Sequence, residues 1–270
     1  MTNHKLHLGD NLATLKNYPD NTFDSIVTSP PYNKLGLRKG TKTSTEIWKG
    51  ANIEYSLYED NMLETEYQQW QIEVINECLR VLKPNGSFFY QHKIRNWERI
   101  GYHPMVWIAK SNAIFYQEII WHRKSTTSID ARYLYNTTER IYWLVKGKPD
   151  VFKDQMDETY KSDVWVIAPT KDTEHPASYP VSLVEHCLRL TMNKPGKVLD
   201  PFMGSGSTGM AAVALGHHFT GCELDPKYIA IAETRINAWT GADTETEVEP
   251  ITPKEESVFE RMFGDNPKDD

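Results

Sequence analysis

Cysteine is scarce in this sequence: only Cys78, Cys187 and Cys222 occur among 270 residues, and they lie far apart. No pair has the spacing of zinc ligands, and an odd, sparse count excludes a disulfide scaffold. This pattern predicts a protein of the reducing cytoplasm that binds no metal. The sequence also lacks a signal peptide and an apolar run long enough to cross a bilayer, so we expect no membrane association.

A surplus of basic residues is also missing, since the formal net charge is −7. However, residues 240–270 alone contain ten acids and three bases, whereas residues 1–239 contain 27 of each. We therefore expect one domain over 1–239 and a solvated acidic tail over 240–270. A neutral domain can still present a local basic patch to nucleic acid phosphates.

Strand and helix patterns alternate along the domain. The predicted strands are 5–8, 23–28, 87–91, 115–122, 140–145, 197–200 and 218–223. The predicted helices are 11–16, 64–82, 104–111, 181–191, 208–215 and 226–239. This alternation predicts an α/β fold with a mostly parallel twisted sheet and helices on both faces. The stretches 33–60 and 147–174 have no clear period and are expected to be insertions.

A glycine-rich segment, Gly204-x-Gly206-x-x-Gly209, follows an apolar strand and begins a helix. Glycine lets the backbone turn sharply and approach a ligand, and the helix start offers free N–H groups. The pattern alone is also found in tight packing turns. Glu223, however, ends the next predicted strand, where an acid accepts hydrogen bonds from ribose hydroxyls. The combination predicts an adenosine-type cofactor and leaves a dinucleotide open.

A second segment, Thr28-Ser29-Pro30-Pro31-Tyr32, lies at the carboxyl end of a strand, where α/β sheets bind ligands. An aromatic amine is a poor nucleophile because its lone pair is delocalised. Ser29 Oγ and the Pro30 carbonyl can accept its two hydrogens and so localise the lone pair, while the prolines hold these acceptors in place. Tyr32 offers a face on which a flipped base can stack. For the motif alone, a rigid turn with a surface tyrosine is the alternative.

Together the two segments resemble the amino-methylating DNA methyltransferases, which modify cytosine N4 or adenine N6. The catalytic motif comes first and the cofactor loop second, which is similar to the permuted beta group of that family. The stretches 9–10, 82–86, 136–146 and 175–180 also resemble family segments, so the likeness spans residues 5–239. It implies a Rossmann-like fold, S-adenosylmethionine as the cofactor, and direct in-line transfer without a metal or covalent intermediate.

The motifs and the resemblance together assign two sets of residues. The catalytic set is Ser29, Pro30, Pro31 and Tyr32. The cofactor-binding set is Asp10, Thr28, Ala177, Ser178, Asp200, Phe202, Gly204, Ser205, Gly206, Thr208 and Glu223. The assignment requires that the turn near residue 30 and the turn near residue 205 lie side by side.

The sequence defines the target base less well than it defines the reaction. In the resembling family, a serine at the start of the catalytic motif is more usual among cytosine enzymes, so Ser29 favours cytosine N4. Adenine N6 stays open because a hydroxyl can accept from either amine. No cysteine lies near either motif, which argues against methylation of a ring carbon. The proton leaves after methyl transfer, and the sequence does not identify its acceptor.

Double-stranded DNA is the expected partner, and its target base must be flipped out of the helix. The expected DNA contacts directly follow the catalytic motif: Asn33, Lys34, Arg38, Lys39, Lys42 and Lys49. The resemblance implies that the insertion at 147–174 also contacts DNA, but it is acidic, so we expect Lys124, Arg132 and the 34–52 loop to share sequence recognition. The basic segment at 92–95 is a further candidate. An ordinary solvated loop is the alternative for 33–60. A homodimer and a cognate restriction endonuclease are additional partners that the resemblance implies.

Three other functions stay open. The same turn could hold an amine of RNA or a glutamine amide of a protein. A nicotinamide oxidoreductase could use the glycine loop, although it would leave Ser29 to Tyr32 unexplained. A non-catalytic DNA-binding module is the third.

Overall fold

The computed structural model describes residues 3–33, 62–97, 100–124, 134–169 and 179–239. The expected acidic tail and residues 34–60 of the first insertion lie outside these ranges. All the described residues belong to one unit that ends at Trp239. None of the helices within these ranges is long and apolar enough to cross a membrane.

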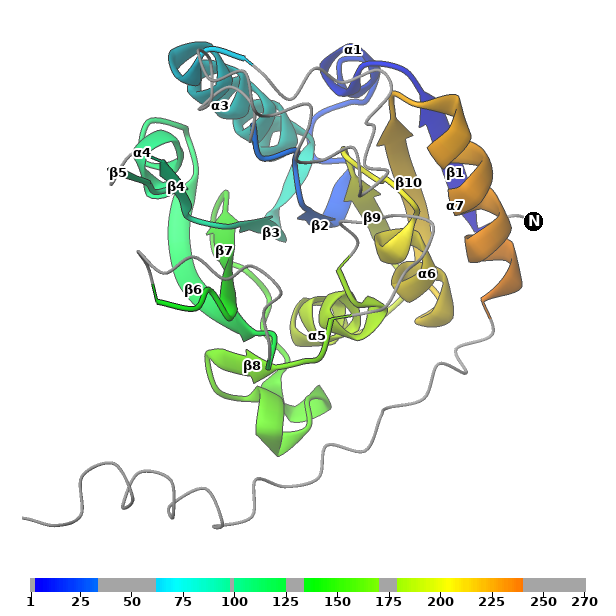
Figure 1. Cartoon of the computed structure of the whole chain (residues 1–270). Helices are drawn as coiled ribbons and strands as arrows, with labels where there is room; N and C mark the ends of the chain where they lie inside the picture. The colour runs from blue at the N-terminus through cyan, green and yellow to red at the C-terminus, as the bar shows by residue number, and fades with distance from the viewer. Residues whose placement is uncertain (1–2, 34–61, 98–99, 125–133, 170–178, 240–270) are drawn as a thin grey trace, which may run out of the picture. The chain divides into compact units, whose positions relative to one another are not determined.

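Eight strands form one sheet in the order β1-β10-β9-β2-β3-β7-β6-β8 (Figure 1). Their bounds, in this order, are His4–Leu8, His218–Glu223, Lys197–Asp200, Phe23–Thr28, Leu82–His92, Thr138–Val145, Ile114–His122 and Val164–Val166. The strands from β1 to β3 pair in parallel, and β8 is parallel to β6, whereas β7 is antiparallel to both neighbours. The predicted α/β fold with a mostly parallel sheet is confirmed.

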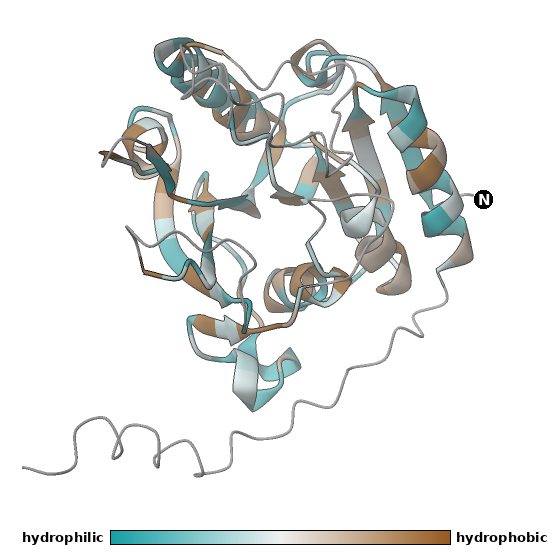
Figure 2. Cartoon of the chain, in the orientation of Figure 1, coloured by the Kyte–Doolittle hydropathy of each residue, from teal (hydrophilic) through white to brown (hydrophobic). Residues whose placement is uncertain are grey.

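Helices pack on both faces of the sheet (Figure 1). One core contains side chains of α1 (Asn11–Leu15), α3 (Glu64–Val81) and α4 (Met105–Ile108). The other contains side chains of α5 (Val181–Thr191), α6 (Ser207–Ala214) and α7 (Pro226–Ala238). Two short 3-10 helices, η2 (Lys153–Gln155) and η3 (Glu158–Tyr160), precede β8. Brown, hydrophobic segments line the interior in Figure 2.

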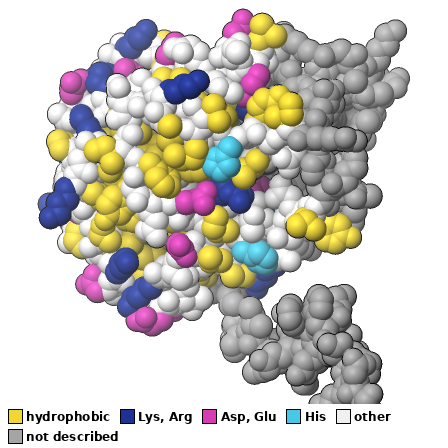
Figure 3. All heavy atoms as spheres, turned by 90° about the vertical axis from the view of Figure 1, so that its left-hand side faces the viewer, with side chains coloured by type: hydrophobic (Ala, Val, Ile, Leu, Met, Phe, Trp, Pro, Cys, Tyr) yellow, Lys and Arg dark blue, Asp and Glu magenta, His cyan; other side chains and the backbone are white. Residues whose placement is uncertain are grey.

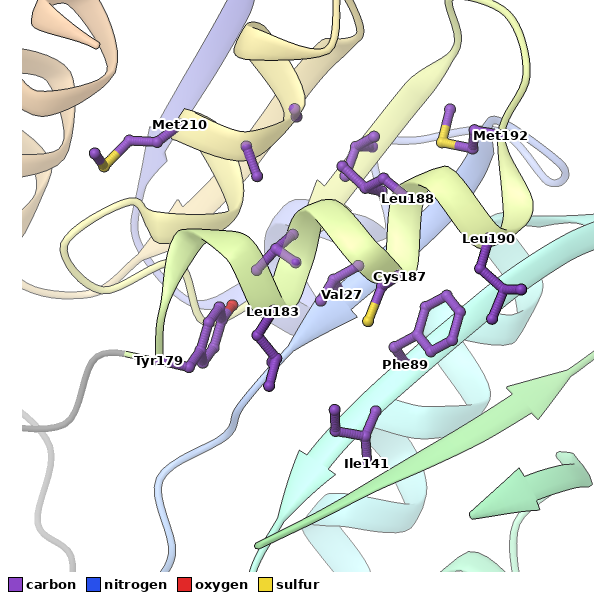
Figure 4. Packing of buried hydrophobic residues seen from close by; sticks show 14 of the residues in the cluster. Val27, Phe89, Ile141, Tyr179, Leu183, Cys187, Leu188, Leu190, Met192 and Met210 are labelled. Atoms are coloured by element: carbon purple, nitrogen blue, oxygen red, sulfur yellow. The ribbon is translucent and has the colours of Figure 1, made fainter. Parts of the chain in front are cut away.

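The central strands are hydrophobic on both sides because each face of the sheet is covered. In β3, for example, Phe89 belongs to the core under α5, whereas Phe88 and Tyr90 belong to the core under α3. Figure 4 shows Leu183 and Cys187 of α5 directed toward Val27, Phe89 and Ile141 of the sheet.

The structure differs from the predicted elements most clearly at β3, at α4 and at a hairpin between them. β3 begins at Leu82 instead of residue 87, because the segment read as a stop forms an irregular first part of the strand. The pairing register shifts there, between Phe23 and Ser25 of β2, so Pro84 lies where the ladder is interrupted. α4 is shorter than predicted, and the hairpin of β4 (Arg95–Trp97) and β5 (Ile100–Tyr102) was not predicted.

Two of the three basic side chains in the segment at 92–95 do not face solvent as a DNA contact would. His92 and Arg95 are buried, at 0% and 4% exposure. Arg95 donates both terminal nitrogens to Glu64, at 2.8 and 2.7 Å, and its guanidinium lies over the Tyr67 ring. The pair therefore ties the first turn of α3 to β4. His92 and Arg95 are thus structural, and a DNA contact from this segment is left to the half-buried Lys93.

Substituting Glu64→Gln should lower the free energy of unfolding by about 2–3 kcal/mol, because it leaves the Arg95 charge buried without its partner. Chemical denaturation measures the loss. The control is Glu158→Gln, which removes a pair with Lys161 whose carboxylate is largely exposed and should change stability by less than about 0.5 kcal/mol. Equal effects of both substitutions would contradict the structural role of Arg95.

The second predicted insertion is anchored to α5 by a stack of rings. The Tyr160 ring lies 3.6 Å from the ring of His186, at an interplanar angle of 28°, and Trp165 packs edge-on at 5.8 Å. Burial, together with the nearby charge of Arg189, lowers the pKa of His186 to about 4. The folded state therefore favours the neutral form of the His186 imidazole.

Acidification should therefore weaken the fold. Unfolded histidine binds a proton below about pH 6.5, and the folded His186 binds one only below about pH 4. The unfolded state holds more protons between these values, so stability present above pH 6.5 is lost as the pH falls to 4, by up to about 3 kcal/mol. Denaturation profiles of wild type and His186→Phe measure this, and the variant should lose that part of the pH dependence. If wild type and His186→Phe lose stability equally between pH 6.5 and 4, His186 is not the source of this pH dependence.

Candidate functional site

The two motifs lie side by side because β2 and β9 are neighbours in the sheet. Ser25 and Ile26 of β2 pair with Val198 and Leu199 of β9, and both strands run in the same direction. Their carboxyl ends therefore reach the same edge of the sheet, where α/β proteins bind ligands. The condition set by the sequence, that the two turns be adjacent, is met.

A buried carboxylate joins the turns. Asp200, at the end of β9, is fully buried and accepts hydrogen bonds from Thr28 (2.6 Å), Thr208 (2.7 Å) and Tyr179 (2.9 Å). Its Oδ1 also accepts from the backbone N–H of Phe202, at 3.0 Å. Burial raises the pKa of Asp200, and these four donors oppose the shift by stabilising the carboxylate. The side chains of Thr28, Asp200 and Thr208 are thus engaged with one another.

Close packing explains two of the glycines in the loop. Gly206 has φ +87°, and a Cβ there would lie 2.9 Å from Cβ of Ala232 in α7. A Cβ on Gly209 would lie 2.4 Å from Ile236. Ser205 is buried and bonded through its hydroxyl and carbonyl to Arg235 of α7. The loop is therefore held against α7 in one conformation.

Glu223 ends β10 directly beside the loop. One of its oxygens accepts from the N–H of Gly204 at 3.0 Å, and the other accepts from Leu224 and Asp225 at 2.9 Å. Burial raises the pKa of Glu223, and these backbone donors oppose the shift. The N–H of Gly9 bonds the Glu223 carbonyl, which brings Asp10 to the same edge.

These positions suit an adenosine-type ligand. Glu223 Oε2 accepts only the Gly204 bond among the backbone donors and keeps a lone pair that can accept from a ribose hydroxyl. Phe202 is half-buried and meets Trp70 of α3 edge-on at 5.5 Å. The Asp10 side chain caps α1 by accepting from Ala13 at 2.8 Å. Ala177 and Ser178 lie outside the described residues.

The predicted catalytic residues 29–32 form a turn, the catalytic turn. Two side chains that the sequence did not indicate pack against it. Tyr67 of α3 donates to the Pro31 carbonyl at 2.8 Å, and the ring of His92 lies 4.5 Å from the ring of Tyr32. Ser29 and Tyr32 are half-buried, and their hydroxyl oxygens are 3.0 Å apart. Ser29 and Tyr32, both in the predicted catalytic set, thus lie on one turn with their hydroxyl groups in contact.

His92 is neutral in this environment. Burial, with the charge of Arg95, lowers its pKa well below the usual range. Its Nδ1 lies 2.7 Å from the Lys93 carbonyl, which can only accept, so Nδ1 carries the hydrogen. Nε2, 2.8 Å from the Tyr67 hydroxyl, is then an acceptor. The single hydroxyl hydrogen of Tyr67 is therefore shared between His92 and Pro31.

A third carboxylate, Glu139 of β7, faces the catalytic turn. Its Oε2 lies 3.4 Å from the Tyr32 hydroxyl and also accepts from Gln91 of β3. Its Oε1 pairs with Arg123 at 3.0 Å. The side chain is 12% exposed. Sequence reasoning noted the stretch 136–146 but not this residue, because nothing local marks a carboxylate whose partners are so distant in the chain.

Asn33 does not have the place expected for a DNA contact. Its side chain is fully buried, its φ is +52°, and its amide donates to the Met62 carbonyl at 3.0 Å. It therefore anchors the end of the catalytic turn instead of facing solvent. The other expected DNA contacts, Lys34, Arg38, Lys39, Lys42 and Lys49, lie outside the described residues.

Metal ligands and reactive thiols do not gather in the part of the chain that the structure describes. No group of three histidine, cysteine, aspartate or glutamate side chains there could hold a metal ion. All three cysteines are buried and unpaired. Burial raises the pKa of each thiol, which makes a nucleophilic thiolate unfavourable.

The chain matches a family model described as DNA methylase over residues 23–234. It is 30% identical to the type II methyltransferase M.HinfI of Haemophilus influenzae over 249 residues, covering 84% of this chain and 67% of that protein. Among solved structures, the PvuII DNA methyltransferase (cytosine-N4-specific) aligns with a TM-score of 0.70 at 17% identity, over 96% of this chain and 91% of the other.

A DNA modification methylase from Thermus thermophilus, solved in complex with S-adenosyl-L-methionine, aligns with a TM-score of 0.63 at 24% identity. The alignment covers 86% of this chain and 93% of that one. At these identities the two structures show a shared fold.

The Asp200 cluster yields a stability prediction. Thr28→Val keeps the side-chain shape but removes a donor to a buried carboxylate, so the free energy of unfolding should fall by about 1.5–3 kcal/mol. Denaturant titration measures the change. The control is Thr234→Val on α7, where an exposed hydroxyl donates to the Ala230 carbonyl and the expected change is below about 0.5 kcal/mol. A neutral Thr28→Val would mean that Asp200 does not depend on this contact.

Proposed function

Because the chain belongs to the DNA methylase family, we propose how its own residues carry out the reaction of that family. The protein is a DNA methyltransferase that acts on an exocyclic amino group, and S-adenosylmethionine is its methyl donor. The observation that carries the proposal is the adjacency of the Ser29 turn and the glycine loop, joined through Asp200.

The donor is held, in this proposal, at the ends of β9, β10 and β1. Glu223 accepts the ribose hydroxyls, the backbone of the 204–206 loop contacts the sugar and sulfur side, and Asp10 and Phe202 lie toward the adenine. Ala177 and Ser178 are assigned to the methionine part by resemblance alone. When bound, S-adenosylmethionine supplies an electrophilic methyl group on a sulfonium. Thr28, Asp200 and Thr208 act by joining the loop to the catalytic turn, since their side chains are buried.

The target base is bound on the other side of the turn. Ser29 Oγ and the Pro30 carbonyl accept its amino hydrogens, and Pro30 and Pro31 keep these acceptors in place. The Tyr32 ring offers a stacking face, which His92 supports from behind. No covalent intermediate is required, because positioning of the two reactants is the main contribution.

Cytosine N4 is the base we favour, on the basis of the serine in the motif, and adenine N6 is the alternative. A hydroxyl oxygen can accept a hydrogen bond from the amino group of either base. A flipped base in double-stranded DNA is the substrate in either case.

Restriction-modification is the context that the type II relatives support. A cognate endonuclease, a cytoplasmic location and a homodimer are proposals. The dimer is supported by an apolar face at the left of Figure 1, which Figure 3 shows directly. β5, α4 and the start of β6 expose Ile100, Val106, Ile114, Phe115 and Tyr116. Within the described residues, β8 pairs only with Ile120–His122, so the first half of β6 is an open edge.

Methyl transfer from labelled S-adenosylmethionine to plasmid DNA, followed by nucleoside analysis, tests the function. Label should appear as N4-methylcytosine, and Ser29→Ala should lower kcat roughly 100-fold by removing one acceptor. The control, Ser182→Ala on the exposed surface of α5, should retain full activity.

Other outcomes separate the alternatives. Label on adenine N6 would overturn the base assignment, and label only on RNA or on protein glutamine would overturn the DNA substrate. Calorimetric binding of NAD without binding of S-adenosylmethionine would indicate an oxidoreductase. Full biological activity of Ser29→Ala would indicate a non-catalytic DNA-binding module.

A further inference from the structure

The reaction leaves one proton without an assigned acceptor. Once the amino nitrogen has formed its new bond to carbon, it carries a positive charge and still holds both hydrogens. Such a cation is a strong acid, because the lone pair that resonance delocalised is now used in a bond. The Ser29 hydroxyl is too weak a base to retain the proton, so the site needs a further acceptor.

We propose that Glu139 is this acceptor, and that Ser29 and Tyr32 relay the proton to it. The inference rests on the proposed function of Ser29. The three groups form a continuous path: Ser29 Oγ lies 3.0 Å from the Tyr32 hydroxyl, which lies 3.4 Å from Glu139 Oε2. The second contact is long, as catalytic hydrogen bonds often are before substrate binds.

The surroundings of Glu139 fix the position of its carboxylate. Gln91 is buried and donates its amide to Oε2, and Arg123 holds Oε1 from the opposite side. Arg123 is fixed in turn by donating to the Asn136 carbonyl at 2.7 Å. The carboxylate is thus oriented with one oxygen toward the catalytic turn. A strongly acidic cation needs only a weak base, so a carboxylate suffices as the acceptor.

The step balances in atoms and charge. The sulfur–methyl bond breaks and the nitrogen–methyl bond forms, which moves the positive charge from sulfur to nitrogen. Nitrogen then gives one proton to Ser29 Oγ, Ser29 gives its own proton to Tyr32, and Tyr32 gives its proton to Glu139. The products are neutral methylated base and neutral Glu139, which returns its proton to water.

Glu139→Gln and Tyr32→Phe test the relay in the full-length protein. Each should lower kcat roughly 100-fold, because the methylated cation leaves the site only after it has lost its proton, with unchanged Kd for S-adenosylmethionine and for DNA. The double variant should be no slower than the slower single variant, because both act on one path. The control is Glu118→Gln, which removes a neighbouring carboxylate of β6 that pairs with Arg140 at 3.4 Å; it should leave the rate unchanged.

A second readout does not depend on activity. If the Tyr32–Glu139 contact exists, the shifts in denaturation midpoint of the two single variants should not add in the double variant. Tyr32→Phe keeps the ring and its packing on His92, so it remains informative if Glu139→Gln folds poorly.

The outcomes are distinct. A wild-type protein that transfers no methyl group would overturn the proposed function itself. Wild-type transfer together with a normal rate in either Tyr32→Phe or Glu139→Gln would overturn the relay alone. A Glu139→Gln variant whose defect is confined to Kd for DNA would identify Glu139 as a substrate-binding residue and would likewise overturn it.

Discussion

The hydrogen bonds that converge on Asp200 are the interaction on which the rest of this site depends. Thr28 comes from the end of β2, Thr208 from the first turn of α6, and Tyr179 from the residues before α5. A buried carboxylate without such donors would be strongly unfavourable. The same donors fix the ends of the two strands relative to each other. Cofactor loop and catalytic turn are therefore one rigid unit, not two sites that happen to be close.

The antiparallel direction of β7 determines which of its residues lie near the catalytic turn. β2 and β3 present their carboxyl ends at the active edge, so residues from those strands reach it only at their last positions. β7 runs the other way and presents its beginning, where His92 of β3 pairs with Arg140. Glu139 is thereby placed opposite Tyr32, although the two are 107 positions apart in the sequence. A fully parallel sheet would have directed that part of β7 to the opposite edge.

The regular elements could be predicted from the sequence because each depends on local pattern. The helix over 181–191 and the strands over 23–28, 197–200 and 218–223 have the predicted bounds. The hairpin at β4 and β5 has only three residues in each strand, too few for a period to emerge. The supports of the site could not be predicted for another reason. His92, Arg95 and Glu139 are polar, and sequence alone does not reveal that each is enclosed by partners from other elements. Asn33 was misread for the same reason.

The pairing of β1 with β10 limits when the complete sheet can form during translation. His4 lies beside Phe219, 215 positions later in the chain. During translation the first strand must leave the ribosome and remain without its neighbour until nearly the entire domain has been made. The catalytic half of the sheet is synthesised long before the cofactor half is complete. A nascent chain can therefore hold the methyl donor only when its first and last strands meet.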